Sequence, residues 1–424
     1  MTDDLRPILQ RLAPKPPRPV DVHALMAEGK KRRRTRVAIG SATLVLLATA
    51  AIIPVRLALE ESRDGPVQPA IDRPTPSETV DDNVAIRVWQ NLRPGWTKLA
   101  PPPEPRTDPV SVWTAREGAV ELFLWGGYTG YGGSVHADGF AWSPDTNDWR
   151  RLPDAPLAPH SRAGAVFTGS EVIVWGGYGS NQESLGDGAA YDIAADSWRS
   201  IAEAPITARA PLSTIWTGRE MIVWGSYERP SGQADGAAYD PSDDTWRPIA
   251  RAPRSLDLAT TVWTGDEMVV FGALLDNNNA SRTDHAVGLA YDPESDSWRE
   301  LAPSQLSPQA SAIAWTGSEV IAWDYGLRAA AYNPTKDRWR SLPDVPLKSY
   351  ECYPASVDIG SFVMAWFCGQ AALWDFADGG WRKIPTPEAV VPGRPVAAGE
   401  VVFFAGAAHE SEYSSLWVYA PPAD

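Results

Sequence analysis

Tyrosine, aspartate and arginine side chains recur at similar spacing through the middle of this 424-residue chain. A tyrosine directly follows a Gly-Gly or Gly-Ser pair three times, and an aspartate lies eight to ten residues beyond each of these tyrosines. Phenol, carboxylate and guanidinium groups together offer donors and acceptors to a polar ligand such as a carbohydrate or a peptide. The candidate ligand-binding residues are therefore Tyr128, Asp138, Arg162, Tyr178, Asp187, Arg209, Tyr227 and Asp235.

A purely structural role for the same residues stays open. Asp138, Asp187 and Asp235 each precede a glycine, and Asp-Gly pairs commonly close turns, while the arginines can satisfy loop carbonyls. No residue is assigned to catalysis, to a metal or to a cofactor. The chain has two cysteines, no CxxC motif and no Cys/His cluster with zinc spacing.

These residues belong to a sequence repeat of 41 to 52 residues. Each copy contains two apolar runs, joined by Thr-Gly in the most regular copies, then Ala-Tyr-Asp and finally Trp-Arg; one copy spans residues 215–247. The short β-branched runs predict strands, and Thr-Gly predicts a tight hairpin turn. The most regular element is an aromatic residue followed seven positions later by tryptophan, at Trp142/Trp149, Tyr191/Trp198, Tyr239/Trp246, Tyr291/Trp298, Tyr332/Trp339 and Trp374/Trp381.

Six such pairs in register, with the glycine pairs Gly126-Gly127 and Gly176-Gly177, resemble the kelch repeat over roughly residues 94–420. The resemblance implies an all-β fold, a kelch-type β-propeller with four antiparallel strands per blade. Seven outer-strand tryptophans and seven inner-strand runs predict seven blades. The first of these tryptophans, Trp96, precedes the first inner-strand run, and none follows the last run. We therefore expect residues 96–99 to complete the C-terminal blade. Trp89 lies seven residues before Trp96, which is the spacing of the repeat. An alternative is therefore that the N-terminal segment supplies two strands of that blade.

The resemblance also raises an enzymatic alternative, because galactose oxidase is a related propeller with a copper site. That chemistry needs two histidines and a tyrosine cross-linked to a cysteine, whereas His136, His160, His285 and His409 fall in different loops. A glycan-acting enzyme is the other alternative of this class. Asp240–Trp246 superficially resembles the Asp box of sialidases but lacks its glycine, and such a box is a structural turn.

An uncharged run at residues 37–55 is long enough to span a bilayer as a helix. Six basic residues lie in the seven positions before it, so we expect residues 1–36 to be a short cytoplasmic tail and the propeller to lie outside the cytoplasmic membrane. Cleavage as a signal peptide is the alternative. Residues 56–93 include the Pro-rich stretch 65–82 and predict a linker.

Charge is divided unevenly along the chain. The net charge is −15, of which residues 1–64 contribute +5, so the remainder carries −20. An acidic surface repels phosphate backbones, and nucleic acid is not expected as a partner. The tail contains one short amphipathic segment, residues 3–12, and resembles the tails of actinobacterial anti-sigma-like membrane proteins, which implies a possible cytoplasmic partner of residues 1–36.

The two cysteines, Cys352 and Cys368, lie at nearly equal distances from Gly360, where a hairpin turn is expected. Outside the cytoplasm this arrangement favours a disulfide, and two separate buried thiols are the alternative. The resulting interpretation is a membrane-anchored recognition module that binds a polar ligand or an envelope protein at one propeller mouth. A propeller-type enzyme and the sensor part of a signalling protein remain alternatives.

Overall fold

The computed structural model describes residues 92, 94–116, 119–130, 133–227, 233–274, 283–308, 310–348, 355–367, 369–387, 395–406 and 415–422. All of them lie in one compact unit, Asp72–Asp424. The predicted tail (1–36), the predicted membrane span (37–55) and nearly all of the predicted linker fall outside the described residues, as do both cysteines. Among the described residues, no helix is long and apolar enough to cross a membrane.

The described strands form seven sheets of four antiparallel strands, which are the seven predicted blades. Blade 1 contains β2 (Val110–Arg116), β3 (Ala119–Trp125), β4 (Gly139–Ser143) and β5 (Asp148–Arg151). Blade 2 contains β6 (Gly164–Phe167), β7 (Glu171–Tyr178), β8 (Ser184–Asp192) and β9 (Ser197–Ser200). Blade 3 contains β10 (Ser213–Trp216), β11 (Met221–Trp224), β12 (Gly236–Asp240) and β13 (Thr245–Pro248).

Blade 4 contains β14 (Asp257–Trp263), β15 (Met268–Ala273), β16 (Val287–Asp292) and β17 (Ser297–Glu300). Blade 5 contains β18 (Ala310–Trp315), β19 (Val320–Asp324), β20 (Ala329–Asn333) and β21 (Arg338–Leu342), with the 3-10 helix Pro334–Lys336 in its last turn. Blade 6 contains β22 (Ala355–Ile359), β23 (Phe362–Phe367), β24 (Gln370–Asp375) and β25 (Gly380–Ile384). Blade 7 contains β26 (Pro395–Ala398), β27 (Val401–Gly406), β28 (Ser415–Ala420) and β1 (Gly95–Leu99).

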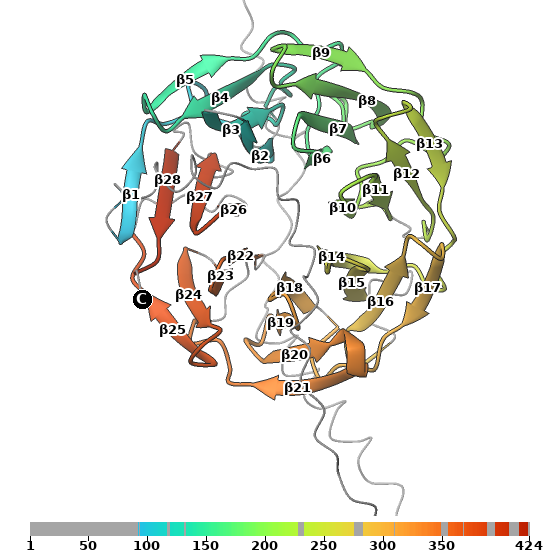
Figure 1. The fold of residues 1–424 in the computed structure, drawn as a ribbon, viewed down its shortest axis with the longest axis vertical. Coiled ribbons are helices and arrows are strands. Elements are labelled where there is room, and N and C mark those ends of the chain that lie inside the picture. Colours follow the sequence, from blue (N-terminus) through green and yellow to red (C-terminus); the bar gives the residue numbers. More distant parts are fainter. Residues whose placement is uncertain are drawn as a thin grey trace, which may run out of the picture. The chain divides into compact units, whose positions relative to one another are not determined.

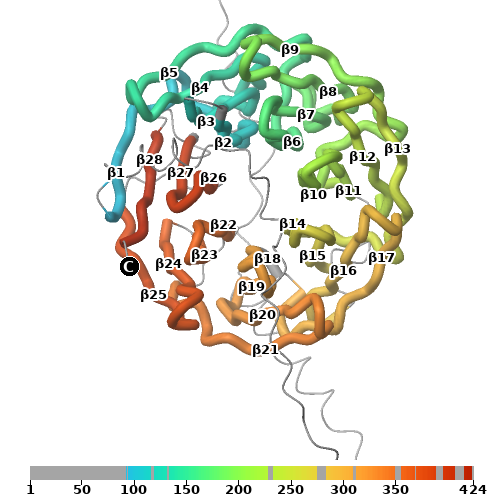
Figure 2. Tube along the Cα trace, in the orientation of Figure 1, coloured from blue at the N-terminus to red at the C-terminus, as the bar shows by residue number. Residues whose placement is uncertain are grey.

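The blades are arranged in a closed ring (Figures 1 and 2). The first strand of each blade surrounds the centre and contacts the first strand of the next blade, and β26 contacts β2 to complete the circle. The last blade is assembled from both ends of the described chain, because β1 pairs with β28 from Gly95↔Ala420 to Leu99↔Leu416. The prediction that one N-terminal strand completes the C-terminal blade is therefore confirmed.

The Thr-Gly turns join the first two strands in blades 2, 3, 4 and 5. Gly169, Gly218, Gly265 and Gly317 have positive φ angles of 101°, 94°, 103° and 85°, a region that glycine adopts without steric cost. In blade 2, the Thr168 hydroxyl also accepts a hydrogen bond from the backbone N–H of Glu171 at 3.0 Å. The threonine thus closes the turn, and the acid begins the second strand.

Six of the seven outer-strand tryptophans attach their blades to the preceding ones; the exception is Trp381, whose buried indole nitrogen has no hydrogen-bond partner among the described residues. The indole N–H of Trp246 donates to Ala202 O, at the end of the previous blade, at 2.9 Å. Trp96 makes the corresponding bond to Pro385 O at 2.8 Å and so joins blade 7 to blade 6. The same contact is made by Trp149, Trp198, Trp298 and Trp339. The regular spacing of these tryptophans reflects this repeated attachment.

A charged network crosses four of the blade junctions. Arg199 binds Glu171 in its own blade at 2.9 and 3.0 Å and reaches the hydroxyl of Tyr239 in the next blade at 3.2 Å. That hydroxyl donates to Asp244 at 2.7 Å. Equivalent networks are Glu121–Arg150–Tyr191–Asp196, Glu220–Arg247–Tyr291–Asp296 and Glu267–Arg299–Tyr332–Asp337. In blade 6, Trp374 replaces the tyrosine, so the network stops there.

Candidate functional site

The predicted ligand-binding residues lie where the inter-blade links meet the loops between the second and third strands. We call this the link-side face; it is built in blades 1 to 3 by the links 100–109, 152–163 and 201–212, and in blade 4 by the link 249–256 and the start of β14. Thr107 and Tyr128 exchange two backbone hydrogen bonds of 2.9 Å, and Ser161 and Tyr178 exchange bonds of 2.9 and 2.8 Å. Tyr227 N donates to Ala210 O at 3.0 Å. The three tyrosines therefore occupy equivalent positions in successive blades.

Tyr128, Asp108 and Arg162 form one polar group that joins blades 1 and 2. Arg162 Nε donates to Asp108 Oδ2 at 2.7 Å, and the Tyr128 hydroxyl donates to the same oxygen at 3.4 Å. The Arg162 side chain is 42 % exposed, so its remaining guanidinium surface is open to solvent. Partial burial and the neighbouring Asp108 carboxylate raise the pKa of Tyr128, which keeps its hydroxyl protonated as a donor.

The backbone beneath this group has an unusual conformation. Asp108 and Arg162 have φ angles of 49° and 53°, in the left-handed region that costs non-glycine residues energy. Leu258, at the corresponding position of blade 4, has a φ of 50° and is the one exposed large hydrophobic residue in the part of the chain that the structure describes. The link-side face thus presents an arginine–aspartate pair and an apolar side chain from equivalent positions.

Arg209 and Asp235 form a pair that is largely internal. The Arg209 side chain is completely buried; its Nη1 and Nη2 reach the two Asp235 carboxylate oxygens at 3.0 and 3.2 Å, and its Nε donates to Thr207 O. Partial burial of Asp235 is the largest single effect and opposes its ionisation, but the hydrogen bond to Arg209, the charge of Arg209 and a backbone hydrogen bond together outweigh burial and lower the pKa of the carboxyl group. Arg209 is thus enclosed by protein groups.

Asp138 has the same environment in blade 1, where its partner is the buried Arg106. Arg106 Nη2 donates to Asp138 Oδ1 at 2.7 Å, and Nη1 donates to the carbonyls of Asp138 and Gly126 at 2.8 and 3.1 Å. Partial burial is the largest single effect and opposes ionisation of Asp138, but the hydrogen bond to Arg106, the charge of Arg106 and a backbone hydrogen bond together lower its pKa. Arg106 lies in the first link, four residues before β2. The sequence shows this position in the link, but it does not show that Arg106 pairs with Asp138.

In blade 2, His160 takes the place of Arg106 and Arg209, and Asp187 takes the place of Asp138 and Asp235. His160 is fully buried; its Nδ1 lies 2.9 Å from Gly176 O and its Nε2 lies 3.5 Å from Asp187 Oδ1. Burial lowers the pKa of His160 and favours the neutral ring. Asp187 is half exposed and, unlike Asp138 and Asp235, pairs with no arginine in the part of the chain that the structure describes. It is the most accessible of the three predicted aspartates.

Of the predicted residues, Tyr128 and Arg162 share one cluster, and Arg209 and Asp235 share another. Asp138 pairs with Arg106, and Asp187 lies beside His160. Tyr178 and Tyr227 are partly buried at the positions given above. Assignment of these eight residues to ligand binding stays a prediction.

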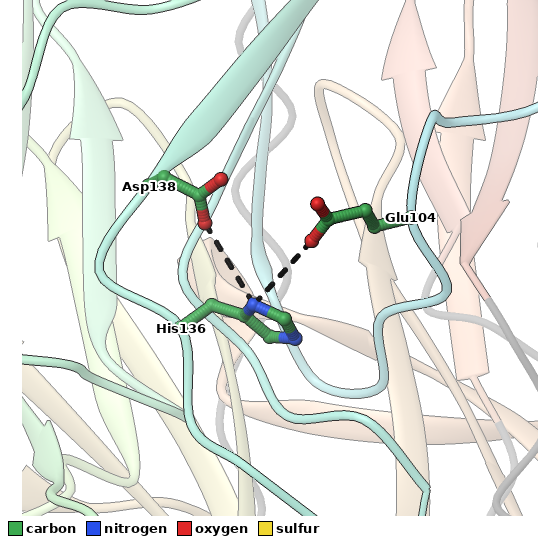
Figure 3. Close-up of side chains that lie close together, drawn as sticks. All are labelled: Glu104, His136 and Asp138. Carbon is green, nitrogen blue, oxygen red and sulfur yellow. Dashed lines mark ion pairs between the residues drawn. The ribbon is translucent and has the colours of Figure 1, made fainter.

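A third cluster contains Glu104, His136 and Asp138, at the first link and the loop before β4 (Figure 3). One donor atom from each residue lies within 4.8 Å of the other two. His136 Nδ1 is 3.7 Å from both Glu104 Oε2 and Asp138 Oδ1. Sequence reasoning missed this group, because Glu104 and His136 are far apart in the chain and no short motif joins them.

A family model described as the KLHDC2/KLHL20/DRC7 Kelch-repeats domain matches residues 113–318, just under half of the chain. The matched segment begins in β2 and ends after β18, and the same four-strand unit continues through the remaining blades. The described fold is a kelch β-propeller. No curated protein shows a significant match to the chain. A kelch β-propeller supports a protein-binding role and leaves the partner open.

Proposed function

We propose that this kelch β-propeller recognises a protein partner through the link-side face of blades 1, 2 and 4. The observation that supports the proposal best is the Tyr128–Asp108–Arg162 group. Asp108 fixes the guanidinium from one direction while much of Arg162 remains exposed, so the group is preorganised and can still bind a polar partner atom. Leu258 adds an apolar contact, and Asp187 adds an exposed carboxylate.

Site-specific photocross-linking tests this proposal. A photoreactive amino acid at Leu258 should give a discrete cross-linked product in cells that make the full chain, and Arg162→Ala should reduce its yield about tenfold through loss of a central polar contact. Arg340→Ala is a matched control, since Arg340 is similarly exposed and binds Glu319 at 2.6 Å in blade 5, outside the three blades of the proposed face. Equal yields with Arg162→Ala and Arg340→Ala would refute the proposed face.

The proposed setting of the propeller is the outer side of a cytoplasmic membrane, with residues 37–55 as an uncleaved anchor and residues 1–36 inside. This proposal depends on the apolar run and its basic N-terminal flank. The full chain should remain in the membrane fraction after alkaline carbonate extraction, and protease added to spheroplasts should digest the propeller after mild heating. Extraction by carbonate, or protection of the propeller until the membrane is lysed, would contradict it.

A further inference from the structure

The cluster of Glu104, His136 and Asp138 is held in place by the backbone on both sides of the histidine. His136 N donates to Gly127 O at 2.8 Å, and His136 O accepts from His160 N at 3.1 Å. His136 Nε2 lies 2.7 Å from the Thr129 hydroxyl, which fixes the ring orientation. Figure 3 shows that the other ring nitrogen, Nδ1, points between the two carboxylates.

The arrangement of donors and acceptors in this cluster is incomplete for either neutral form of the ring. If Nε2 carries the proton and donates to Thr129, the Nδ1 lone pair faces Glu104 Oε2 and Asp138 Oδ1. Arg106 Nη2 already reaches these two oxygens at 3.4 and 2.7 Å, so of the three acceptors only Nδ1 has no donor among the described residues. If Nδ1 carries the proton, both oxygens lie at 3.7 Å, beyond hydrogen-bond distance. A cation between the three atoms would supply the partner that Nδ1 lacks.

Arg106 lies beside the cluster without completing it. Its Nη2 is 2.7 Å from Asp138 Oδ1 and 3.4 Å from Glu104 Oε2, and its side chain is fully buried. With two carboxylates, one guanidinium and a neutral imidazole, the net charge of the group is about −1. Carboxylates that bind metal ions are themselves commonly hydrogen-bonded by a neighbouring group, and Arg106 has that place here.

We propose that Glu104, His136 and Asp138 bind a divalent transition-metal ion, with Zn²⁺ as the preferred ion. Imidazole nitrogen and carboxylate oxygen are both ligands that zinc takes, whereas Ca²⁺ takes six to eight oxygen ligands. Zinc bonds of about 2.0–2.2 Å in a tetrahedron separate the ligand atoms by about 3.4 Å. The two separations from His136 Nδ1, both 3.7 Å, require only a small contraction, and the two carboxylate oxygens lie within 4.8 Å of each other. The Glu104 side chain is half exposed, which leaves an open coordination position.

Calorimetric titration of ZnCl₂ into the EDTA-treated full chain tests this site. We expect about one Zn²⁺ ion to bind each chain with high affinity. His136→Gln and Glu104→Gln should each weaken this affinity about tenfold or more, as the loss of a metal ligand or of a group that orients one does. His285→Gln is the matched control, because His285 also lies beside a carboxylate, Asp284 at 2.7 Å, in another loop. CaCl₂ should not occupy the site at the same concentrations.

The variants need a check of folding, so their thermal unfolding in EDTA should match that of the parent chain. Glu104→Gln is the safer variant, since Glu104 is half exposed. Substitution of Co²⁺ should give visible absorption bands that disappear with His136→Gln. Equal Zn²⁺ affinity in the parent chain and both variants, or no Zn²⁺ binding below millimolar concentrations, would overturn the proposal.

Discussion

At the residue scale, the tyrosine hydroxyls explain why the repeat prefers tyrosine to phenylalanine before the last turn. The Tyr239 ring packs 5.1 Å from Trp246, as the spacing of seven predicted, while its hydroxyl joins Arg199 and Asp244 from two blades. Burial and the bond from its hydroxyl to Asp244 raise the pKa of Tyr239 to about 12, although Arg199 opposes the shift. The hydroxyl is therefore protonated at all physiological pH values.

Tyr239→Phe should lower the free energy of unfolding by about 1–2 kcal/mol, because it removes the shared donor and leaves partly buried charged partners. Chemical denaturation of the full chain measures the effect. Tyr419→Phe is the comparison, since Tyr419 has the same place in blade 7 but its hydroxyl makes no hydrogen bond to the described residues, so its loss should be smaller. Equal losses for the two variants would contradict this account.

His160 should make stability depend on pH. Its pKa is below the ordinary 6.5 in the folded chain because burial opposes the charged ring. As the pH falls from about 6.5 towards the folded-state pKa, the unfolded chain binds a proton that the folded chain does not, so stability decreases. His160→Asn should flatten the pH dependence of the unfolding midpoint between about pH 7 and 5, whereas an unchanged slope would contradict this assignment.

At the element scale, equivalent positions in successive blades are occupied either by a charged pair or by two apolar side chains. Blades 1 and 3 use Arg106–Asp138 and Arg209–Asp235, whereas blade 4 places Leu256 and Val287 at the equivalent sites. Both choices fill the space between the link and the third strand. The charged pair is therefore replaceable, provided that both members change together.

Arg209→Leu alone should destabilise the chain by about 2–3 kcal/mol, because Asp235 loses its partner while solvent still reaches part of the carboxylate. The double variant Arg209→Leu/Asp235→Val copies blade 4 and should regain most of that loss. Urea unfolding of both single variants and the double variant gives the coupling free energy. If the losses of the two single variants simply add in the double variant, Arg209 and Asp235 do not stabilise the chain as a pair.

At the scale of the whole molecule, much of the fold followed from periodicity. Tryptophan spacing predicted seven blades and the shared last blade, because six of the seven outer-strand indoles repeat one inter-blade bond. The site was harder to predict, because side-chain pairing depends on contacts between distant segments. The repeated Tyr128, Tyr178 and Tyr227 positions were visible, but the burial of Arg209, the role of Arg106 and the approach of Glu104 to His136 were not.

Closure of the ring depends on Trp96, which packs against Trp366, Phe404 and Tyr419 at 5.9, 5.3 and 5.1 Å. Trp96→Ala should destabilise the chain by about 3–5 kcal/mol, and amide hydrogen exchange should accelerate first in β27 and β28. Trp339→Ala breaks the equivalent bond on a strand, β21, that follows the other three strands of its blade directly in sequence, so protection there should fall less. Uniform acceleration around the ring would contradict a special role for closure.

The pairing of Gly95 with Ala420 has a mechanical consequence. Both polypeptide ends leave the last blade from the same end of one antiparallel ladder, so a pulling force between them loads the hydrogen bonds one after another. Five residue pairs opened in sequence resist far less force than five sheared together. Tension applied through the N-terminus would therefore peel β1 away from β28, while the six remaining blades keep all of their strands.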